Sequence, residues 1–456
     1  MGRVTIQLKS QGKIVVSRSK QDFDANIQAA KTNEGEVHFM ACRRFEASGA
    51  TRPSRRVLLL QGLMGPLFRR LGEELAQSGH EVFKFNFNGG DRFYWRLPGG
   101  MDYRGSLEEW PDTLRAVIRE KKISDVVLFG DCRPHHLAAT KVCEDLQVPV
   151  HVFEEGYIRP DWVTLELGGV NGHSRLPRDP DWYRRVASTL PPVPEHKQVK
   201  SSFRRRALEG LAYNCADILT RWNYPHWANH RPWHPLIEGF GWAHKLARGK
   251  RRRKNSEQLV ERLLAGEAPY YLFPLQLASD SQIRLHSPFA SMTDALMLVL
   301  KSFAAHAPAD TRLVVKEHPL DNGVCDWNEE TRTIATMLGV EDRVDYMAWG
   351  DIVPVARAAR GMITINSTSG TLALDMDVPV VALGQCVFDI PGITFQGELD
   401  SFWTQASPPD RELFNAFRRV LIERCLIPGG FFSEEALDKV VQHAVARLEG
   451  RQMLPD

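Results

Sequence analysis

Leu313-Val-Val-Lys-Glu-His-Pro319 and, about fifty residues later, Ile365-Asn-Ser-Thr-Ser-Gly-Thr371 are the two most informative stretches of the chain. Each is an apolar run that ends abruptly in polar residues suited to binding a phosphate. In doubly wound α/β domains, ligands bind just beyond the carboxyl ends of the strands. The second stretch also places three hydroxyl residues where a helix should begin, and the free N–H groups of a helix start favour an anion. Together the two strand ends indicate a nucleotide phosphate site.

Strands and helices alternate on both sides of these stretches. Apolar runs predict strands at 57–60, 82–87, 126–130, 148–153, 270–274, 313–315, 344–347, 362–365 and 378–383. Helical periodicity fills the intervals, for example at 66–78, 107–122 and 134–146. Such alternation implies mostly parallel sheets covered on both faces. The predicted fold class is therefore α/β, with two Rossmann-like domains facing a central cleft.

A chain of 456 residues is too long for one ordinary core, so more than one domain is expected. The predicted segments are 1–50, with one expected strand at 13–17; 51–170, the first Rossmann-like domain; 171–260, an irregular aromatic and basic insertion or linker; 261–408, the second Rossmann-like domain; and 409–456, the C-terminal helices. We expect these last helices to cross back to the first domain.

Composition indicates the cellular compartment more than the activity. A net charge of +2 gives no overall nucleic-acid signal, and seven cysteines without CxxC spacing favour a reducing compartment over a zinc site. No apolar run approaches the roughly 18–20 residues of a membrane span, and the N-terminus has no signal-peptide pattern. We therefore expect a cytoplasmic protein that touches a membrane without crossing it.

Carboxylates at two predicted strand ends are the candidates for acid/base and nucleophilic chemistry. Glu154 and Glu155 follow the strand at 148–153, and mutual repulsion or burial would raise the pKa of one of them. Their alternative role is a solvated acidic turn. Asp280 follows the strand at 270–274, and it serves either as a nucleophile or as a helix N-cap.

Polar residues near these carboxylates and strand ends are the predicted ligand contacts. His318, aimed by Pro319 and flanked by Lys316, is expected to donate to a phosphate oxygen, although a structural role is the alternative. Gly370 would allow close backbone approach beside the hydroxyl residues. The full set of predicted binding residues is Gln276, Ser281, Gln282, Lys316, His318, Pro319, Ser367, Thr368, Ser369 and Gly370.

Two further patterns in the sequence could bind a metal or a membrane. Asp179-Pro-Asp181 and Asp375-Met-Asp377 match an Asp-x-Asp metal motif, but we assign a metal to neither. The middle of the chain interleaves aromatic rings with cations, as surfaces in the headgroup region of a bilayer do. The predicted membrane contacts are Trp227, Trp233, Arg251, Arg252 and Arg253. A solvated loop is the alternative, and nothing else supports single-stranded nucleic acid.

Glu154-Glu-Gly156, the loop from Gln276 through Asp280-Ser-Gln282, Lys316-Glu-His-Pro319 and Ser367-Thr-Ser-Gly370 occur in an order that resembles the capsule polysaccharide biosynthesis family. Each motif is weak alone, but the ordered set is fairly specific and covers the chain from about Arg55 onward. The Glu-Gly and His-Pro motifs are also similar to those of bacterial sialyltransferases, which use another CMP-activated 2-keto sugar acid.

The resemblance implies a two-domain GT-B fold and a retaining β-Kdo transferase. Its donor would be CMP-Kdo and its acceptor phosphatidylglycerol or lysophosphatidylglycerol, at the inner face of the inner membrane and beside other capsule assembly proteins. Asp280 would then be the nucleophile, and Glu154 or Glu155 the acid/base. His318 and the turn at Ser367 would hold the phosphate without a metal, and Lys316 or Arg284 would face the donor carboxylate.

Two rival functions stay open from the sequence. One is a GT-B transferase or epimerase that uses a UDP-sugar, which a comparison of CMP and UDP binding would separate. The other is a non-catalytic protein that binds glycolipid and capsule export proteins, which variants at Glu155, Asp280 and His318 would separate.

Overall fold

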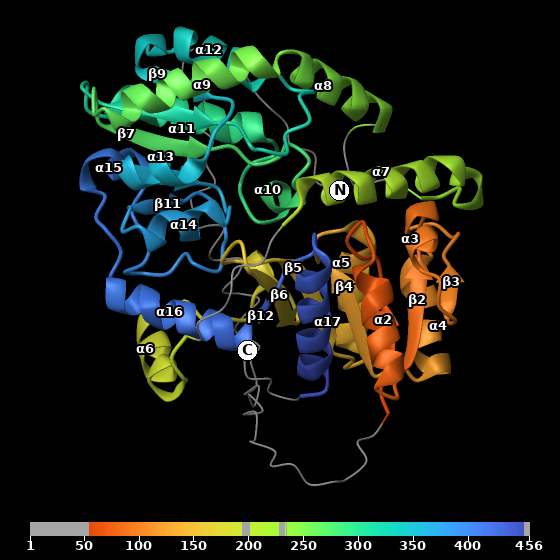
Figure 1. The fold of residues 1–456 in the computed structure, drawn as a ribbon. Helices are drawn as coiled ribbons and strands as arrows, with labels where there is room; N and C mark the ends of the chain where they lie inside the picture. Colours follow the sequence, from red (N-terminus) through yellow and green to blue (C-terminus); the bar gives the residue numbers. More distant parts are fainter. Residues whose placement is uncertain (1–53, 194–200, 228–232, 234, 451–456) are drawn as a thin grey trace, which may run out of the picture. The chain divides into compact units, whose positions relative to one another are not determined.

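The computed structural model describes residues 54–193, 201–227, 233 and 235–450 (Figure 1). The chain divides into two units, Met1–Arg52 and Pro53–Asp456, and all the described residues belong to the second. The strand expected at 13–17 lies outside the described residues.

The first half of the described chain and one C-terminal strand build a seven-stranded sheet in the order β12-β6-β5-β4-β1-β2-β3. Its strands are β1 (Arg56–Leu59), β2 (Glu81–Asn86), β3 (Gly100–Asp102), β4 (Asp125–Phe129), β5 (Val150–Glu155), β6 (Trp162–Leu167) and β12 (Leu426–Pro428). β1 to β5 pair in parallel, whereas β6 is antiparallel to both β5 and β12. The sequence did not predict β3, β6 or β12.

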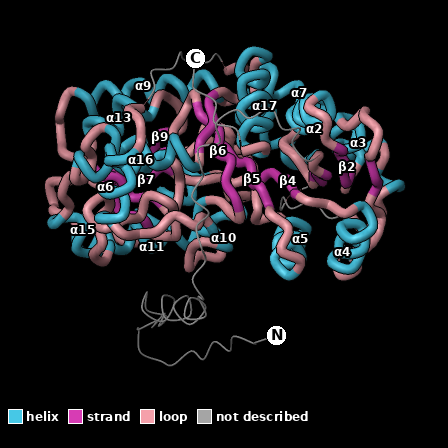
Figure 2. The backbone as a smooth tube through the Cα atoms, turned by 90° about the horizontal axis from the view of Figure 1, so that it is seen from below, coloured by secondary structure: helices cyan, strands magenta, loops and turns pink. Residues whose placement is uncertain are grey.

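Helices cover both faces of this sheet because successive side chains of its strands point to opposite sides. Leu58 packs in the core with residues of α4 (Trp110–Lys121) and α5 (Pro134–Asp145). Its neighbours Val57 and Leu59 pack in the core that contains residues of α2 (Leu67–Gln77). Figure 2 shows α4 and α5 on one side of the strands and α2 and α17 on the other.

The second half builds a five-stranded, all-parallel sheet in the order β11-β10-β7-β8-β9. Its strands are β7 (Tyr270–Pro274), β8 (Arg312–Lys316), β9 (Val344–Met347), β10 (Gly361–Thr364) and β11 (Val380–Ala382). The helices among them are α10 (Ser281–Leu285), α11 (Met292–His306), α12 (Trp327–Met337), α13 (Ile352–Ala358), α14 (Ser369–Asp375) and α15 (Leu399–Gln405). The two sheets confirm the α/β class with two Rossmann-like halves.

The C-terminal segment returns to the first sheet. It consists of α16 (Arg411–Arg424), β12 and α17 (Glu434–Leu448). β12 pairs with β6, and Arg70 of α2 forms ion pairs with Glu434 and Asp438 of α17. This return of the C-terminal helices matches the GT-B-like arrangement that the sequence predicted.

The middle of the chain is helical, so the prediction of an irregular insertion at 171–260 was wrong. Its elements are α6 (Pro180–Thr189), α7 (Phe203–Leu219), α8 (Pro235–Ala247), α9 (Gly249–Leu264) and two short 3₁₀ turns at Asn171–His173 and Arg221–Asn223. The prolines mislead because Pro180 and Pro235 stand at helix starts, where proline is tolerated. Among the described helices, including α3 (Gly89–Tyr94), none has the length and apolar character to cross a bilayer.

Candidate functional site at the junction of the two sheets

The sequence predicted that Glu154 and Glu155 lie in the turn after a strand at 148–153. In the structure both glutamates lie within strand β5. β5 extends through Glu155 because β6 pairs with it, with Glu154 opposite Thr164 and Glu155 opposite Val163. Since neighbouring strand residues point to opposite faces, the two carboxylates have different surroundings. The pairing of β5 therefore gives Glu154 and Glu155 separate environments, which the sequence does not reveal.

Glu155 is held as a counter-ion. Its carboxylate accepts from the Arg159 and Arg206 guanidinium groups at 2.9 Å each. Although burial acts to raise it, these two cations hold the pKa of Glu155 below its ordinary value. A carboxylate with two fixed guanidinium partners is poorly suited to exchanging protons near neutral pH.

Glu154 is the carboxyl group whose pKa suits proton transfer. One oxygen accepts the N–H of Glu155 at 3.0 Å. Burial raises the pKa of Glu154 to about 7, and the negative charges of Glu155, Asp280 and Asp131 act in the same direction. A group with that pKa changes protonation state near neutral pH, as a general acid or base must.

Asp280 does cap helix α10, and its carboxylate is fixed in doing so. One oxygen accepts the Gln282 N–H at 2.9 Å, and the other accepts from the Gln276 side chain at 3.2 Å. Burial raises the pKa of Asp280, while the two hydrogen bonds and the Arg159 charge oppose that rise. The cap role is thus confirmed, and the same contacts hold the carboxylate in one orientation.

Gln276 and Gln282 tie the loops of the site together. The Gln276 amide bonds Asn366 in both directions, donating at 2.8 Å to its side chain and accepting its backbone N–H at 3.1 Å. The Gln282 side chain accepts from Asn171 at 3.1 Å, which links the second half of the chain to the first. Ser281 lies between them as the first residue of α10. These amides position the site around Asp280.

His318 lies two residues after the end of β8, and one hydrogen bond fixes the tautomer of its ring. Its Nδ1 accepts the Leu320 N–H at 3.1 Å, so the proton of the neutral ring lies on Nε2. Burial lowers the pKa of His318 to about 4, which keeps the ring neutral. Pro319 is exposed in the same turn. A neutral imidazole with a free N–H remains a hydrogen-bond donor for an oxyanion.

Lys316 does not have the place predicted for it. Its side chain is buried, and its ammonium donates to the Glu317 carbonyl at 3.1 Å. Burial lowers the pKa of Lys316. A phosphate or carboxylate contact is therefore not supported for Lys316, whereas Arg284 is exposed at the end of α10.

The hydroxyl residues lie together at the start of α14. The Ser369 hydroxyl donates to that of Ser367 at 3.0 Å, and Thr368 precedes the first helical residue. Gly370 packs closely against the core, because a Cβ there would lie 2.7 Å from the Phe388 ring. Packing therefore requires a glycine at this position, and the approach of a ligand to its backbone stays a prediction.

Sequence reasoning missed four residues that the junction brings together. His173 Nδ1 lies 3.0 Å from Asp131, and Cys132 Sγ lies 3.3 Å from His286 Nε2. Asp131 lies two residues after the end of β4, so the strand-end rule applied at Pro319 and Ser367 would have flagged it. His173 and His286 have no such signal, because they meet only in the folded chain.

These four side chains could hold a metal, since their ligand atoms lie within 4.8 Å of one another. A set of carboxylate, thiol and two imidazoles suits Zn²⁺. The four also serve as polar partners for one another, so the cluster is satisfied as it stands. The expectation that no metal takes part stays a prediction.

The two Asp-x-Asp sequences have structural roles. Asp179 caps α6 by accepting the Asp181 N–H at 2.9 Å, and Asp181 pairs with Arg184. Asp375 and Asp377 form ion pairs with Arg418 and Arg411 of α16.

The predicted membrane residues divide into three groups. Trp227 is buried beside Phe87, so its prediction as a surface contact was wrong. Arg252 pairs with the buried Glu317, and Arg253 pairs with Glu257 at 2.7 Å. Trp233 is partly buried, and Arg251 is exposed.

Comparisons with known proteins show the family to which the chain belongs. Residues 124–432, which include every strand-end motif of the junction, match the family described as "Capsule polysaccharide biosynthesis protein". The chain belongs to the capsule polysaccharide biosynthesis family. It is 36% identical over 388 residues to the capsule polysaccharide modification protein LipB of Neisseria meningitidis serogroup A, covering 83% of this chain and 92% of LipB. It is 34% identical over 379 residues to the Escherichia coli capsule polysaccharide export protein KpsS, covering 83% and 97%.

Solved structures are more distant from this member of the capsule polysaccharide biosynthesis family. KpsC of Thermosulfurimonas dismutans, titled a beta Kdo 2,7 transferase, aligns with a TM-score of 0.40 at 13% identity, covering 86% of this chain and all of KpsC. A Rickettsia africae glycosyltransferase aligns with a TM-score of 0.35 at 10% identity, covering 87% and 99%.

Proposed function

We propose that this protein transfers Kdo from CMP-Kdo to a phosphatidylglycerol or lysophosphatidylglycerol acceptor, with retention of configuration. The observation that carries the proposal is the meeting of Glu154 and Asp280 at one junction. One carboxyl group has a pKa of about 7, and the other is oriented by two hydrogen bonds. The same strand ends supply His318 and the hydroxyl residues at Ser367 for a phosphate.

In the first step, a carboxylate oxygen of Asp280 attacks the anomeric carbon of Kdo. The bond from that carbon to the phosphate oxygen breaks, and CMP leaves with the electron pair. Nε2–H of His318 and the hydroxyls of Ser367 and Ser369 stabilise the phosphate charge. A single phosphate needs no metal in this scheme, because preorganised donors surround it.

In the second step, Glu154 removes the proton from the acceptor hydroxyl. The resulting oxygen attacks the same anomeric carbon, and the ester to Asp280 breaks. Two inversions give retention. We assign Glu154 and not Glu155 as the base, because Glu155 is bound to two guanidinium groups.

Arg159 is our candidate for the carboxylate of the donor, in place of Lys316. Its guanidinium group pairs with Glu155, is half exposed, and acts electrostatically on both Asp280 and His318. A cation between these groups is placed to meet a 2-keto sugar acid. We expect such an enzyme to act in the cytoplasm, at the inner face of the inner membrane, alongside other capsule assembly proteins.

Titration of the purified protein with CMP and UDP tests the donor class first. We expect CMP to bind at least tenfold more tightly than UDP, and the His318→Ala variant to lose most of that binding. Stronger binding of UDP would overturn the donor assignment. Full transferase activity in each of the variants Glu154→Ala, Asp280→Ala and His318→Ala would overturn the assignment of the active site.

A further inference from the structure

Helix α7 turns its polar side toward the protein. The Tyr213 hydroxyl is buried in hydrogen bonds with Gln61, Asn88 and Asp91 at 2.8–3.0 Å. A Cβ at Gly90 of α3 would lie 2.6 Å from the Tyr213 ring, so the two helices pack without space between them. Polar contacts therefore hold α7 in place, and they fix which side of it faces outward.

The outward side of α7 is apolar. Leu208, Leu211, Ile218 and Trp222 are 55%, 60%, 44% and 75% exposed. Their spacing of three, seven and four residues puts them on one side of a helix, continued by the 3₁₀ turn that holds Trp222. Cys215, four residues after Leu211, is exposed on the same side of the helix. In an ordinary surface helix this stripe would be the buried side.

The exposure of large apolar side chains is concentrated in this part of the chain. Nine of the nineteen such residues among the described ones fall between Phe203 and Leu246. On α8, Phe240 and Leu246 are 79% and 73% exposed. Apolar groups scattered singly are normal on a surface, but a concentration of this kind marks a site of interaction.

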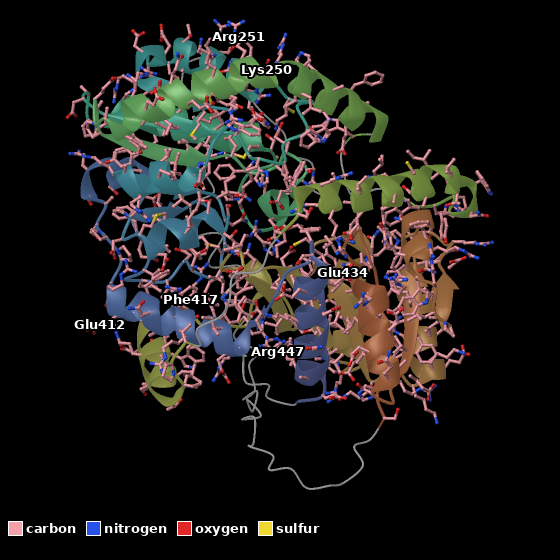
Figure 3. All side chains as sticks on the ribbon, in the orientation of Figure 1. Lys250, Arg251, Glu412, Phe417, Glu434 and Arg447 are labelled. Carbon is pink, nitrogen blue, oxygen red and sulfur yellow. The ribbon has the colours of Figure 1, made fainter. Side chains whose placement is uncertain are left out.

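Positive charge accompanies the apolar side chains. Residues 203–254 contain twelve arginines and lysines against three acidic residues, Glu209, Asp217 and Glu238, whereas the whole chain is nearly balanced. Figure 3 shows Lys250 and Arg251 at the outer side of α9. Arg251, Arg248 and Phe240 also line a cavity of about 800 Å³.

We propose that the outward side of α7, together with the exposed Phe240 and Leu246 of α8, docks this protein on an anionic phospholipid bilayer. Exposed Leu, Ile, Trp and Phe with a surplus of arginine fit the interface, where rings and aliphatic chains enter the headgroup region and cations meet lipid phosphates. The inference deepens the proposed function, since the acceptor we propose is an anionic lipid.

Vesicle flotation without any donor tests the docking directly. We expect binding to vesicles containing phosphatidylglycerol, and a loss on the order of a hundredfold in the variant Leu211→Ser, Ile218→Ser, Trp222→Ser. Met337→Ser removes a 63% exposed side chain on α12 and serves as the matched control, which should bind like wild type. Binding unchanged in the triple variant would overturn the proposal.

Charge and position provide independent measurements. Arg248→Gln and Arg251→Gln should each weaken vesicle binding about fivefold, whereas Lys301→Gln on α11 should not. An environment-sensitive dye on Cys215, in a Cys42→Ser background, should shift to the blue on vesicles. No shift would overturn the docking of α7 on lipid. A dimer in solution that the triple variant abolishes would show that a second copy of the protein covers this surface instead.

An acceptor that is soluble as a monomer separates this inference from the proposed function. With short-chain lysophosphatidylglycerol, the triple variant should transfer Kdo at the wild-type rate, but it should be slow on vesicles. Absence of transfer from wild type to either acceptor would refute the function and leave the docking intact. If the triple variant loses transfer equally with both acceptors, the three side chains are needed for the reaction itself, and the proposal that they serve only in docking is refuted.

Discussion

Replacing Glu154 by Gln should stabilise the protein and inactivate it. The folded pKa of about 7 lies above the ordinary 4.5, so the folded state holds this proton more tightly than the unfolded state does. The charged form therefore has a destabilising effect that is absent below pH 4.5, grows as the pH rises, and is complete above pH 7. The Gln side chain can still accept the Glu155 N–H while remaining neutral.

The difference between a pKa of about 7 in the folded state and 4.5 in the unfolded state corresponds to roughly 3 kcal/mol at most. By linkage, Glu154→Gln should gain about 1 kcal/mol in unfolding free energy at pH 5.5 and about 3 kcal/mol at pH 8.5. Urea unfolding across this pH range measures the difference. Transfer should fall by at least about a hundredfold, because the general base is lost.

Glu155→Gln is the matched control and should behave in the opposite way. Its folded pKa is lowered by Arg159 and Arg206, so its charge stabilises the protein above the unfolded pKa and that stability is lost as the pH falls. The variant should therefore be less stable than wild type at pH 8. If Glu154→Gln proves destabilising, or if its effect does not change with pH, the assignment of Glu154 as a buried acid/base with a raised pKa is wrong.

Three further predictions test other contacts. Asp280→Asn should abolish transfer yet lower the unfolding free energy by only about 1 kcal/mol, since Asn keeps the cap on α10 and loses only the oxygen that accepts from Gln276; steady-state rates and urea midpoints measure both. The pH profile of kcat/KM should rise through about pH 7 and then level, and a wild-type profile that is flat from pH 6 to 8 would contradict a base of that pKa. Gly370→Ala should destabilise by about 1–3 kcal/mol through contact with Phe388, measured by thermal unfolding, whereas Gly239→Ala in α8, with open space around it, should not.

The sequence predicts most of the sheet strands because buried parallel strands are continuous apolar runs. Tyr270–Pro274 and Arg312–Lys316 are of this kind, and both appeared where they were expected. β12 has only three residues and exists because it pairs with β6, far away in the chain. Such a strand has no local signal.

The sequence predicted which strand ends carry the polar residues of the site, but it did not predict the function of each residue. The choice between Glu154 and Glu155 depends on which face of β5 meets Arg206, 51 residues later in the chain. Lys316 looked like a phosphate ligand because the sequence does not reveal that its side chain is buried. The outward apolar side of α7 was also hidden, because periodicity shows that a helix has two faces without showing which one is covered.

The most direct test of the proposed reaction is mass spectrometry after incubation with CMP-Kdo and short-chain lysophosphatidylglycerol, with nuclear magnetic resonance of the product. We predict an acceptor heavier by one Kdo residue, released CMP, and the same anomeric configuration in donor and product. An unchanged acceptor beside intact CMP-Kdo, or a product of inverted configuration, would contradict the reaction at Asp280 and Glu154.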